Sequence, residues 1–142
     1  TVYVDTSVFG GVYDEEFSVA SGAFLTEVRS GRFNVCVSTI VLEELLGAPE
    51  KVQALYTELA PHVALVDVTP QALLLMRAYL SAKVASEKWR ADALHVAIAT
   101  ASGCQAIVSW NFKHIVHFDK ISLYSEANMA HGFGPLAIHS PQ

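Results

Sequence analysis

Asp5 is the first residue whose position suggests chemistry, because it directly follows the strand-like run Val2–Val4 and precedes Thr6 and Ser7. In open α/β sheets, ligands bind beyond the carboxyl ends of the strands, which is where this carboxylate would lie. We predict that Asp5 binds a metal ion and that Thr6 or Ser7 bonds to its carboxylate or to a metal-bound water. Capping of the next turn is the alternative role for Asp5.

Glu44 is the second candidate, six residues after Ser38, which ends another strand-like run and is expected to cap the following helix. Adjacent helical residues point about 100° apart, so Glu43 and Glu44 cannot share one role. We place Glu44 on the core-facing side of the helix with Val41, and Glu43 on the surface. A carboxylate among core residues requires compensation, which a cation supplies, so Glu44 is a predicted metal ligand.

Asp92 opens the apolar stretch 91–99, which predicts a buried helix. A favourable interaction with the helix dipole would by itself explain an acid in the first turn. However, the stretch carries no other formal charge, and Asp92 would project towards the same edge as Asp5. We therefore predict that Asp92 is a third metal ligand. His95 lies one turn further along, where it is either a core residue or a group that supports the site.

The fourth segment places Ser109 at the end of a strand-like run and Asn111 two residues later. Three carboxylates and an amide, with hydroxyl groups nearby, form a hard oxygen site that suits Mg²⁺ or Mn²⁺. Such an ion activates water and stabilises the leaving oxyanion in phosphodiester hydrolysis. The predicted catalytic residues are Asp5, Glu44, Asp92 and Asn111. The sequence has no glycine-rich phosphate loop, zinc-type cysteine pairs or nucleophile elbow that would indicate another chemistry.

The elements that must position these residues alternate between strand and helix, which predicts an α/β fold: a three-layer α/β/α sandwich around a parallel sheet of about five strands. The strand-like runs are 2–4, 34–38, 63–66, 106–109 and, more weakly, 136–139. Helices are expected over 17–29, 39–46, 50–59, 70–83, 90–102 and 120–130.

Bulk composition supports a single domain over residues 1–142, with 52% hydrophobic residues and a charged share of 16%, below the usual share of about 25%. The net charge of −5 is the wrong sign for a generic nucleic-acid binder, although acidic clusters reverse their effect when they bind divalent metals. Cys36 and Cys104 are expected as buried free thiols in a cytoplasmic protein. The uncharged span 93–112 is interrupted by polar residues and Gly103, so we expect no membrane segment.

The order and spacing of four motifs, Val-Asp-Thr-Ser, Ser-x-x-x-x-x-Glu-Leu, Asp-Ala-x-x-x-Ala and Ser-Trp-Asn-x-x-His, resemble the PIN domain over nearly the whole chain. The small prokaryotic proteins of the VapC toxin type are the members that the chain resembles. Asp5, Glu44 and Asp92 match the three principal acids of the family. Asn111 falls where many members have a fourth Asp, and Ser109 matches a hydroxyl position beside the first acid.

This resemblance implies a Mg²⁺- or Mn²⁺-dependent endoribonuclease. It further implies a homodimer and a small antitoxin protein as partner. Two other readings stay open. The chain could be an RNA-binding or protein-interaction module that keeps the PIN fold with weak catalysis. A Mg²⁺-dependent phosphatase of another class is disfavoured because no Asp-x-Asp follows the first strand, where position 7 is Ser.

Overall fold

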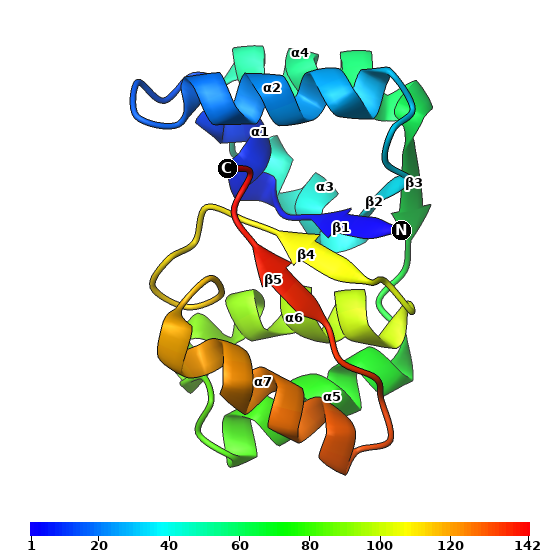
Figure 1. Ribbon diagram of the computed structural model, residues 1–142, viewed down its shortest axis with the longest axis vertical. Coiled ribbons are helices and arrows are strands. Elements are labelled where there is room, and N and C mark those ends of the chain that lie inside the picture. Colours follow the sequence, from blue (N-terminus) through cyan, green and yellow to red (C-terminus); the bar gives the residue numbers. More distant parts are fainter.

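Five short runs of apolar residues form one parallel sheet in the computed structural model, which describes residues 1–142 (Figure 1). The strand order is β3-β2-β1-β4-β5, and every neighbouring pair is parallel. The strands are β1 (Val2–Val4), β2 (Val35–Ser38), β3 (Val63–Val66), β4 (Ala106–Val108) and β5 (Ala137–His139).

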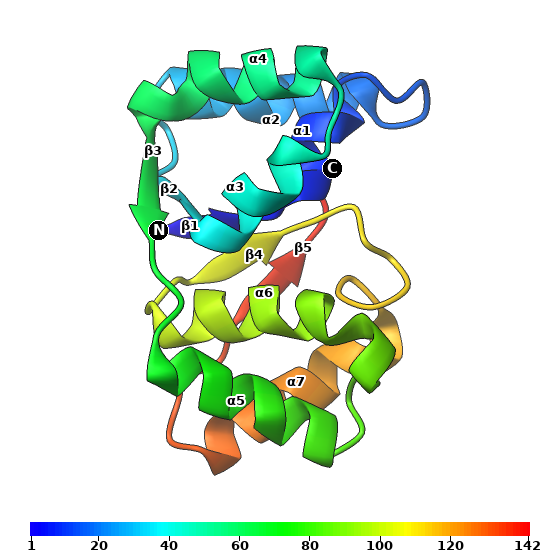
Figure 2. The same cartoon turned by 180° about the vertical axis from the view of Figure 1, so that it is seen from behind.

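Helices cover both faces of this sheet, with α1, α2 and α4 on one side and α5, α6 and α7 on the other (Figures 1 and 2). The predicted three-layer α/β/α architecture is therefore confirmed. The helices are α1 (Thr6–Gly11), α2 (Ser18–Arg29), α3 (Thr39–Leu46), α4 (Glu50–Leu59), α5 (Pro70–Ser81), α6 (Arg90–Ala101) and α7 (Phe118–Ala130), with 3₁₀ turns η1 (Ala60–His62) and η2 (Glu87–Trp89). None of these helices combines the length and apolar character needed to cross a bilayer.

Helix α1 is the one helix that the sequence did not predict. It has only six residues and ends in two glycines, so it carries no readable helical periodicity. Its start is set by Asp5, whose carboxylate accepts a hydrogen bond from the backbone N of Ser7 at 3.1 Å. This bond satisfies one of the free amides at the helix N-terminus, so local capping rather than amphipathicity explains α1.

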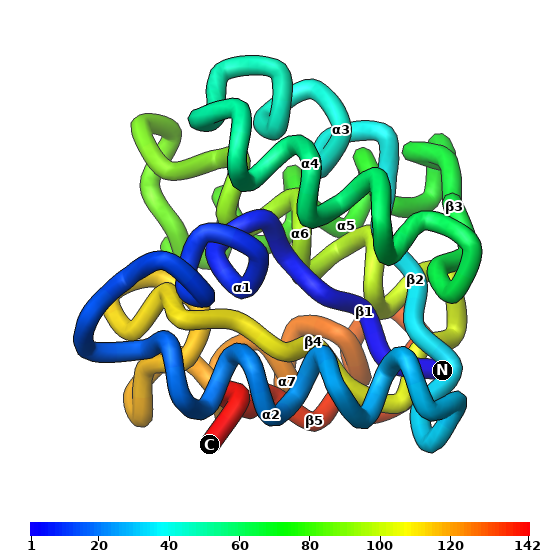
Figure 3. Tube along the Cα trace, turned by 90° about the horizontal axis from the view of Figure 1, so that it is seen from above, coloured from blue at the N-terminus to red at the C-terminus, as the bar shows by residue number.

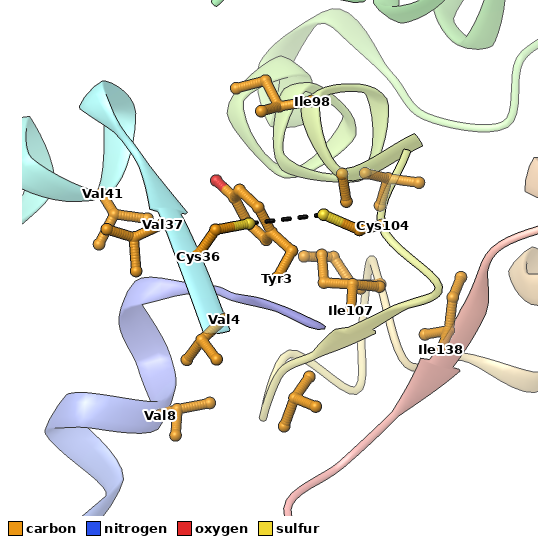
Figure 4. Close-up of a cluster of buried hydrophobic side chains, with 14 of the residues drawn as sticks. Tyr3, Val4, Val8, Cys36, Val37, Val41, Ile98, Cys104, Ile107 and Ile138 are labelled. Atoms are coloured by element: carbon orange, nitrogen blue, oxygen red, sulfur yellow. Dashed lines mark hydrogen bonds between the residues drawn. The ribbon is translucent and has the colours of Figure 1, made fainter. Parts of the chain in front are cut away.

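The core follows from the alternation of side chains along the strands. Tyr3 pairs in register with Cys36 on β2 and Ile107 on β4, and these three side chains face α6 (Figure 4). Val4 points to the other face, where it meets Val8 of α1. All five residues are buried. Helix α6 is buried almost all round, as its apolar sequence predicts.

The two cysteines lie on the Tyr3 side of the sheet. Both are buried and free, as expected, and their Sγ atoms are 3.4 Å apart (Figure 4).

The strand order creates a switch point next to β1. From β1 the chain builds β2 and β3 on one side, whereas β4 and β5 lie on the other, so β1 lies between β2 and β4 (Figure 3). In open α/β sheets the crevice at such a point, outside the carboxyl ends of the strands, is where ligands bind. Asp5 and Ser109 directly follow the two strands that flank this point.

The loop that follows β4 is held against α1 and α2 through Trp110. The indole Nε1 donates to Ser21 Oγ at 2.7 Å, and the ring stacks on Phe17 with centroids 4.1 Å apart. A Cβ atom added at Gly11 would lie 2.5 Å from Ser21 Oγ and 2.7 Å from Trp110 Nε1. Glycine at position 11 is therefore needed for this close approach.

Gly11→Ala is expected to lower the free energy of unfolding by about 1–3 kcal/mol, the usual cost of overpacking. Gly22→Ala is the matched control, because nothing lies within 4 Å of an added Cβ at this position in α2 and alanine is favoured in a helix by about 1 kcal/mol. Urea unfolding of both variants tests this expectation. Equal stability of the two variants would contradict it.

Candidate functional site at the carboxyl edge of the sheet

Asp5 is buried at the end of β1, with 5% of its surface exposed. Its extended backbone continues the strand by one residue, and its N–H donates to the Val108 carbonyl at 3.2 Å. One carboxylate oxygen, Oδ1, accepts from Ser7 Oγ and Ser7 N, and Oδ2 accepts from Ser109 Oγ at 2.8 Å. Asp5 thus caps α1 and also lies at the switch point.

Glu44 reaches the same edge from α3, but not from a core-facing position as the sequence analysis predicted. Its side chain is 40% exposed, whereas Val41 is fully buried. The prediction was wrong because Glu44 lies near the end of a short helix at the sheet's margin, where its long side chain can reach inwards from the surface. Its Oε1 accepts from Thr6 Oγ1 at 2.8 Å. Glu43 is exposed, as expected.

His95 connects Glu44 to the interior of the protein. Its Nε2 lies 2.6 Å from Glu44 Oε1, and its Nδ1 lies 2.7 Å from the Tyr3 hydroxyl. That hydroxyl is in turn 2.7 Å from Ser38 Oγ. Ser38 therefore does not cap α3 with its side chain, contrary to the sequence prediction, because its hydroxyl pairs with Tyr3 instead. The result is a buried hydrogen-bonded chain, Ser38–Tyr3–His95, that ends on Glu44.

Asp92 lies in the first turn of α6, as predicted, and is partly buried. It is one helical turn from His95, so the two side chains share a face of the helix. Its negative charge acts on His95 and also contributes to the raised pKa of Tyr124, for which burial is the main cause. The acid is thus close to the other site residues, while the position also fits dipole stabilisation.

Asn111 lies in the loop that follows β4. Its Oδ1 accepts from the backbone N of His114 at 3.0 Å, and its own N–H donates to Ser109 Oγ at 2.9 Å. The side-chain carbonyl is therefore used to shape the loop, and the amide nitrogen is the group left to bond elsewhere. Ser109 bridges this loop to Asp5.

The electrostatics of the site centre on His95. Burial alone would lower the pKa of His95, but its hydrogen bond to Glu44 and the negative charges of Asp5, Glu44 and Asp92 raise it above the usual value. Burial raises the pKa of Asp5, partly offset by the charge of His95 and the serine hydrogen bonds. Burial also acts to raise the pKa of Glu44, but His95 and Thr6 outweigh it, so this pKa is lowered. The three acids named from the sequence are therefore all within electrostatic range of one buried imidazole.

The donor chemistry of these side chains suits a hard divalent cation, since the negative charges of three carboxylates act on a single compensating group. The side chains are not assembled into a ligand cage, however: no group of three or more His, Cys, Asp or Glu residues lies close enough together to hold an ion. Glu44 Oε1 bonds to Thr6 and His95 instead. The chain therefore matches a metal site in its donor types, while Glu44 is bonded to His95.

Sequence reasoning named Asp5, Glu44, Asp92, Ser109 and Asn111, and all five belong to elements that end or begin at this edge. It identified His95 only as a supporting or core residue and did not find the contacts of Tyr3 and Ser38. The one available signal was a tyrosine in the middle of a buried strand, whose hydroxyl must find a partner.

Comparison with known proteins identifies the family. The model of the PIN domain matches residues 2–121. No protein of curated function matches the chain significantly.

Solved structures with the same fold include three bacterial proteins. FitAcB from Neisseria gonorrhoeae has a TM-score of 0.64 at 16% identity, with 99% of this chain and 98% of that chain covered. VapBC2 from Rickettsia felis, bound to a DNA fragment from its promoter, has a TM-score of 0.61 at 15% identity, with 99% of this chain and 98% of that chain covered. VapC20 from Mycobacterium tuberculosis, a toxin that cleaves the sarcin–ricin loop, has a TM-score of 0.60 at 17% identity, with 94% of this chain and 96% of that chain covered.

At these identities the solved structures establish a shared fold, and the family model covers most of the chain. The parallel five-stranded sheet agrees with that match. The chain belongs to the PIN domain family.

Proposed function

We propose that the chain is a divalent-metal-dependent endoribonuclease that hydrolyses RNA phosphodiesters and acts as the toxin of a type II toxin–antitoxin pair. One observation carries the proposal. Glu44 of α3 bonds to the buried His95, and the negative charges of Asp5, directly after β1, and Asp92 of α6 also act on this imidazole. An excess of negative charge at a ligand-binding edge favours a cation and, through it, a phosphate substrate.

Asp5, Glu44 and Asp92 are the residues that would hold Mg²⁺ or Mn²⁺. When bound, such an ion lowers the pKa of water and neutralises charge on the phosphate. The chain's own side chains orient the acids. Ser7 and Ser109 together bond both oxygens of Asp5 and fix its orientation.

Thr6 and His95 hold one oxygen of Glu44, Oε1, and its other oxygen, Oε2, is the one that would bind the ion. Asn111 has its carbonyl engaged by the loop backbone, so its amide N–H groups are the ones that would donate to a phosphate oxygen or a water. The buried side of the site, formed by Tyr3 and Ser38, excludes bulk water from behind His95.

The partners proposed for this function are an RNA substrate, a second copy of the chain in a homodimer, and a small antitoxin protein. The similarity to VapBC2, which was solved on promoter DNA, and to the VapC20 toxin supports the assignment to a toxin system. The negative net charge is compatible with an RNA substrate only if the acidic site is neutralised when RNA binds.

Asp92→Asn is expected to reduce metal-dependent cleavage of a mixed RNA pool by at least about a hundredfold, the usual scale for losing one electrostatic stabiliser of a transition state. Asp119→Asn is the matched control, because Asp119 also lies in the first turn of a helix, α7, but makes no hydrogen bond or ion pair with the site residues. If Asp92 acted only on the helix dipole, the two variants would behave alike. Cleavage is measured with Mg²⁺ or Mn²⁺ and then with EDTA.

Full cleavage by Asp92→Asn, or cleavage that persists in EDTA, would overturn the proposal. A folded parent that binds RNA but cuts neither the pool nor structured tRNAs would instead support the alternative of a PIN-fold binding module with weak catalysis.

A further inference from the structure

The positive charge of this acidic chain is concentrated in one segment. Residues 83–120 contain five of the nine Lys and Arg residues but only three of the fourteen acids. The segment is therefore net positive while the rest of the chain is strongly negative. It also contains both Asp92 and Asn111, so these cations belong to the same stretch of chain as two residues of the candidate site.

Within this segment, two aromatic rings from different elements stack on each other. Trp89 of η2 and His114 of the loop after β4 have ring centroids 4.3 Å apart and an interplanar angle of 24°. Trp89 is 41% exposed, although large apolar side chains are normally buried. The Lys88 Nζ atom lies 5.1 Å from the centroid of the Trp89 ring. We call Lys88, Trp89 and His114 the aromatic platform.

Both rings of the aromatic platform are connected to residues of the candidate site. Trp89 lies three residues before Asp92, where η2 leads into α6. The backbone N of His114 donates to Asn111 Oδ1, and the His114 carbonyl accepts from the Tyr124 hydroxyl at 2.9 Å. The stack therefore links the start of α6 to the loop that carries Asn111.

One face of the Trp89 ring is covered by His114, which is anchored through its backbone. The ammonium of the exposed Lys88 also lies over the Trp89 ring, and as a flexible and solvated group it can be displaced by a flat ring at little cost. An unpaired base offers such a ring, and base–aromatic stacking is insensitive to base identity because every base has a π-face. The displaced Lys88 and the exposed Lys113 would then be free to pair with neighbouring phosphates.

We propose that the aromatic platform is the subsite that takes an unpaired base of the RNA substrate beside the acidic site, with Lys88 and Lys113 on the adjoining phosphates. The proposal rests on the function proposed above and adds the place where a base of the RNA stacks. The two lysines beside the rings favour a polyanion such as RNA as the ligand over a neutral protein surface. They belong to the one segment of this acidic chain that carries a net positive charge.

The test is RNA binding without cleavage, measured for the parent and all variants by titration calorimetry in EDTA at low salt, with hexauridylate, an abasic ribose-phosphate hexamer and a fully paired RNA duplex. Tryptophan emission reports directly on the subsite, because the only other tryptophan, Trp110, is buried and bonded to Ser21. We expect hexauridylate to quench this emission and to bind more tightly than either of the other probes.

Trp89→Ala is expected to weaken hexauridylate binding roughly 5- to 150-fold, corresponding to about 1–3 kcal/mol of lost stacking. Trp89→Phe should recover part of that loss. Tyr13→Ala is a matched control, because Tyr13 is also an exposed aromatic (44%) with a lysine over its ring, the Lys51 Nζ at 4.8 Å, but belongs to the turn after α1. This variant should bind hexauridylate as the parent does.

Equal affinity for the abasic hexamer and hexauridylate, or equal losses in Trp89→Ala and Tyr13→Ala, would overturn the inference. So would an unchanged hexauridylate affinity in Trp89→Ala, even if that variant bound a protein partner less well. These outcomes are separate from the test of catalysis. If binding depended on the bases but Mn²⁺ gave no cleavage, only the proposed nuclease function would be contradicted. If RNA were cleaved but binding did not depend on the bases, only the proposed subsite would be contradicted.

Discussion

Asp5→Asn is expected to abolish RNA cleavage and, in the absence of metal, to raise the free energy of unfolding at neutral pH. Asparagine preserves the shape of the side chain and can bond to the two serines, but it removes the charge proposed to bind the cation. Cleavage should fall by at least about a thousandfold, the upper range for losing one electrostatic group in a transition state. An assay with Mn²⁺ on the pool that the parent cuts measures this loss.

The stability gain follows from the raised pKa of Asp5, caused by burial. A carboxyl group with a raised pKa in the folded state binds its proton more tightly there than in the unfolded chain. Its contribution to stability is thus fully present below its unfolded pKa and is lost as the pH rises through its folded pKa. At pH 7.5, which is above its unfolded pKa, the buried carboxyl group opposes folding, and Asp5→Asn removes that opposition.

Urea unfolding at pH 7.5 in EDTA should therefore give a higher midpoint for Asp5→Asn than for the parent. Mn²⁺ should raise the midpoint of the parent but not that of the variant, because an ion stabilises only the state that binds it. Asp14→Asn is the control: Asp14 also accepts from a backbone N two residues later, that of Glu16, but it is exposed. A less stable Asp5→Asn, or one that retains cleavage, would contradict the role assigned to this acid.

His95→Ala should produce the second large effect, because it leaves two groups without their partner. The Tyr3 hydroxyl is fully buried and loses one of its two hydrogen bonds, and Glu44 loses the bond that holds it from the interior. We expect the free energy of unfolding to fall by about 1–3 kcal/mol, the cost of an unsatisfied buried polar group. Cleavage should fall about 10- to 100-fold, as when an outer partner of a ligating residue is removed.

Tyr3→Phe separates the two consequences, since it removes the buried hydroxyl but leaves the contact between His95 and Glu44. It should lose stability with a smaller loss of cleavage, and the double variant should be less destabilised than the sum of the two single variants. Additive losses would show that the chain from Ser38 to Glu44 does not act as a unit.

The contact between His95 and Glu44 also predicts a pH dependence. Contributions to stability from the raised pKa of His95 are fully present below its unfolded value of 6.5 and are lost as the pH rises through the folded value. Those from the lowered pKa of Glu44 are present above its unfolded value of 4.5 and are lost as the pH falls through the folded value. The pair therefore stabilises most between these two values.

Asp5 acts in the same direction as His95, so the urea midpoint of the metal-free parent should decline from pH 6 to pH 8.5. Asp5, Glu44, Asp92 and Tyr3 are the titratable groups that act on His95 or bond to it. In His95→Ala the histidine component of the decline should be absent. An equally steep decline in parent and variant would show that His95 is not its source.

The sequence by itself determined the layers of this protein and the acids at its edge. Short apolar runs separated by amphipathic stretches could form only a covered parallel sheet, and an acid or hydroxyl that follows such a run must lie at the carboxyl edge. Asp5 and Ser109 were identified for that reason, and the charge of Asp92 was evident in an otherwise neutral helix. These are properties of the local chain.

Other features were decided by the tertiary structure because they depend on contacts between distant segments. Helical periodicity gives the direction of Glu44 around its axis, but only the placement of α3 at the sheet's margin leaves that side chain 40% exposed. The Ser38 hydroxyl had a local role available as a cap and instead bonds to Tyr3, 35 residues away. The meeting of Trp89 with His114 also depends on the strand order, which brings the start of α6 against the loop after β4.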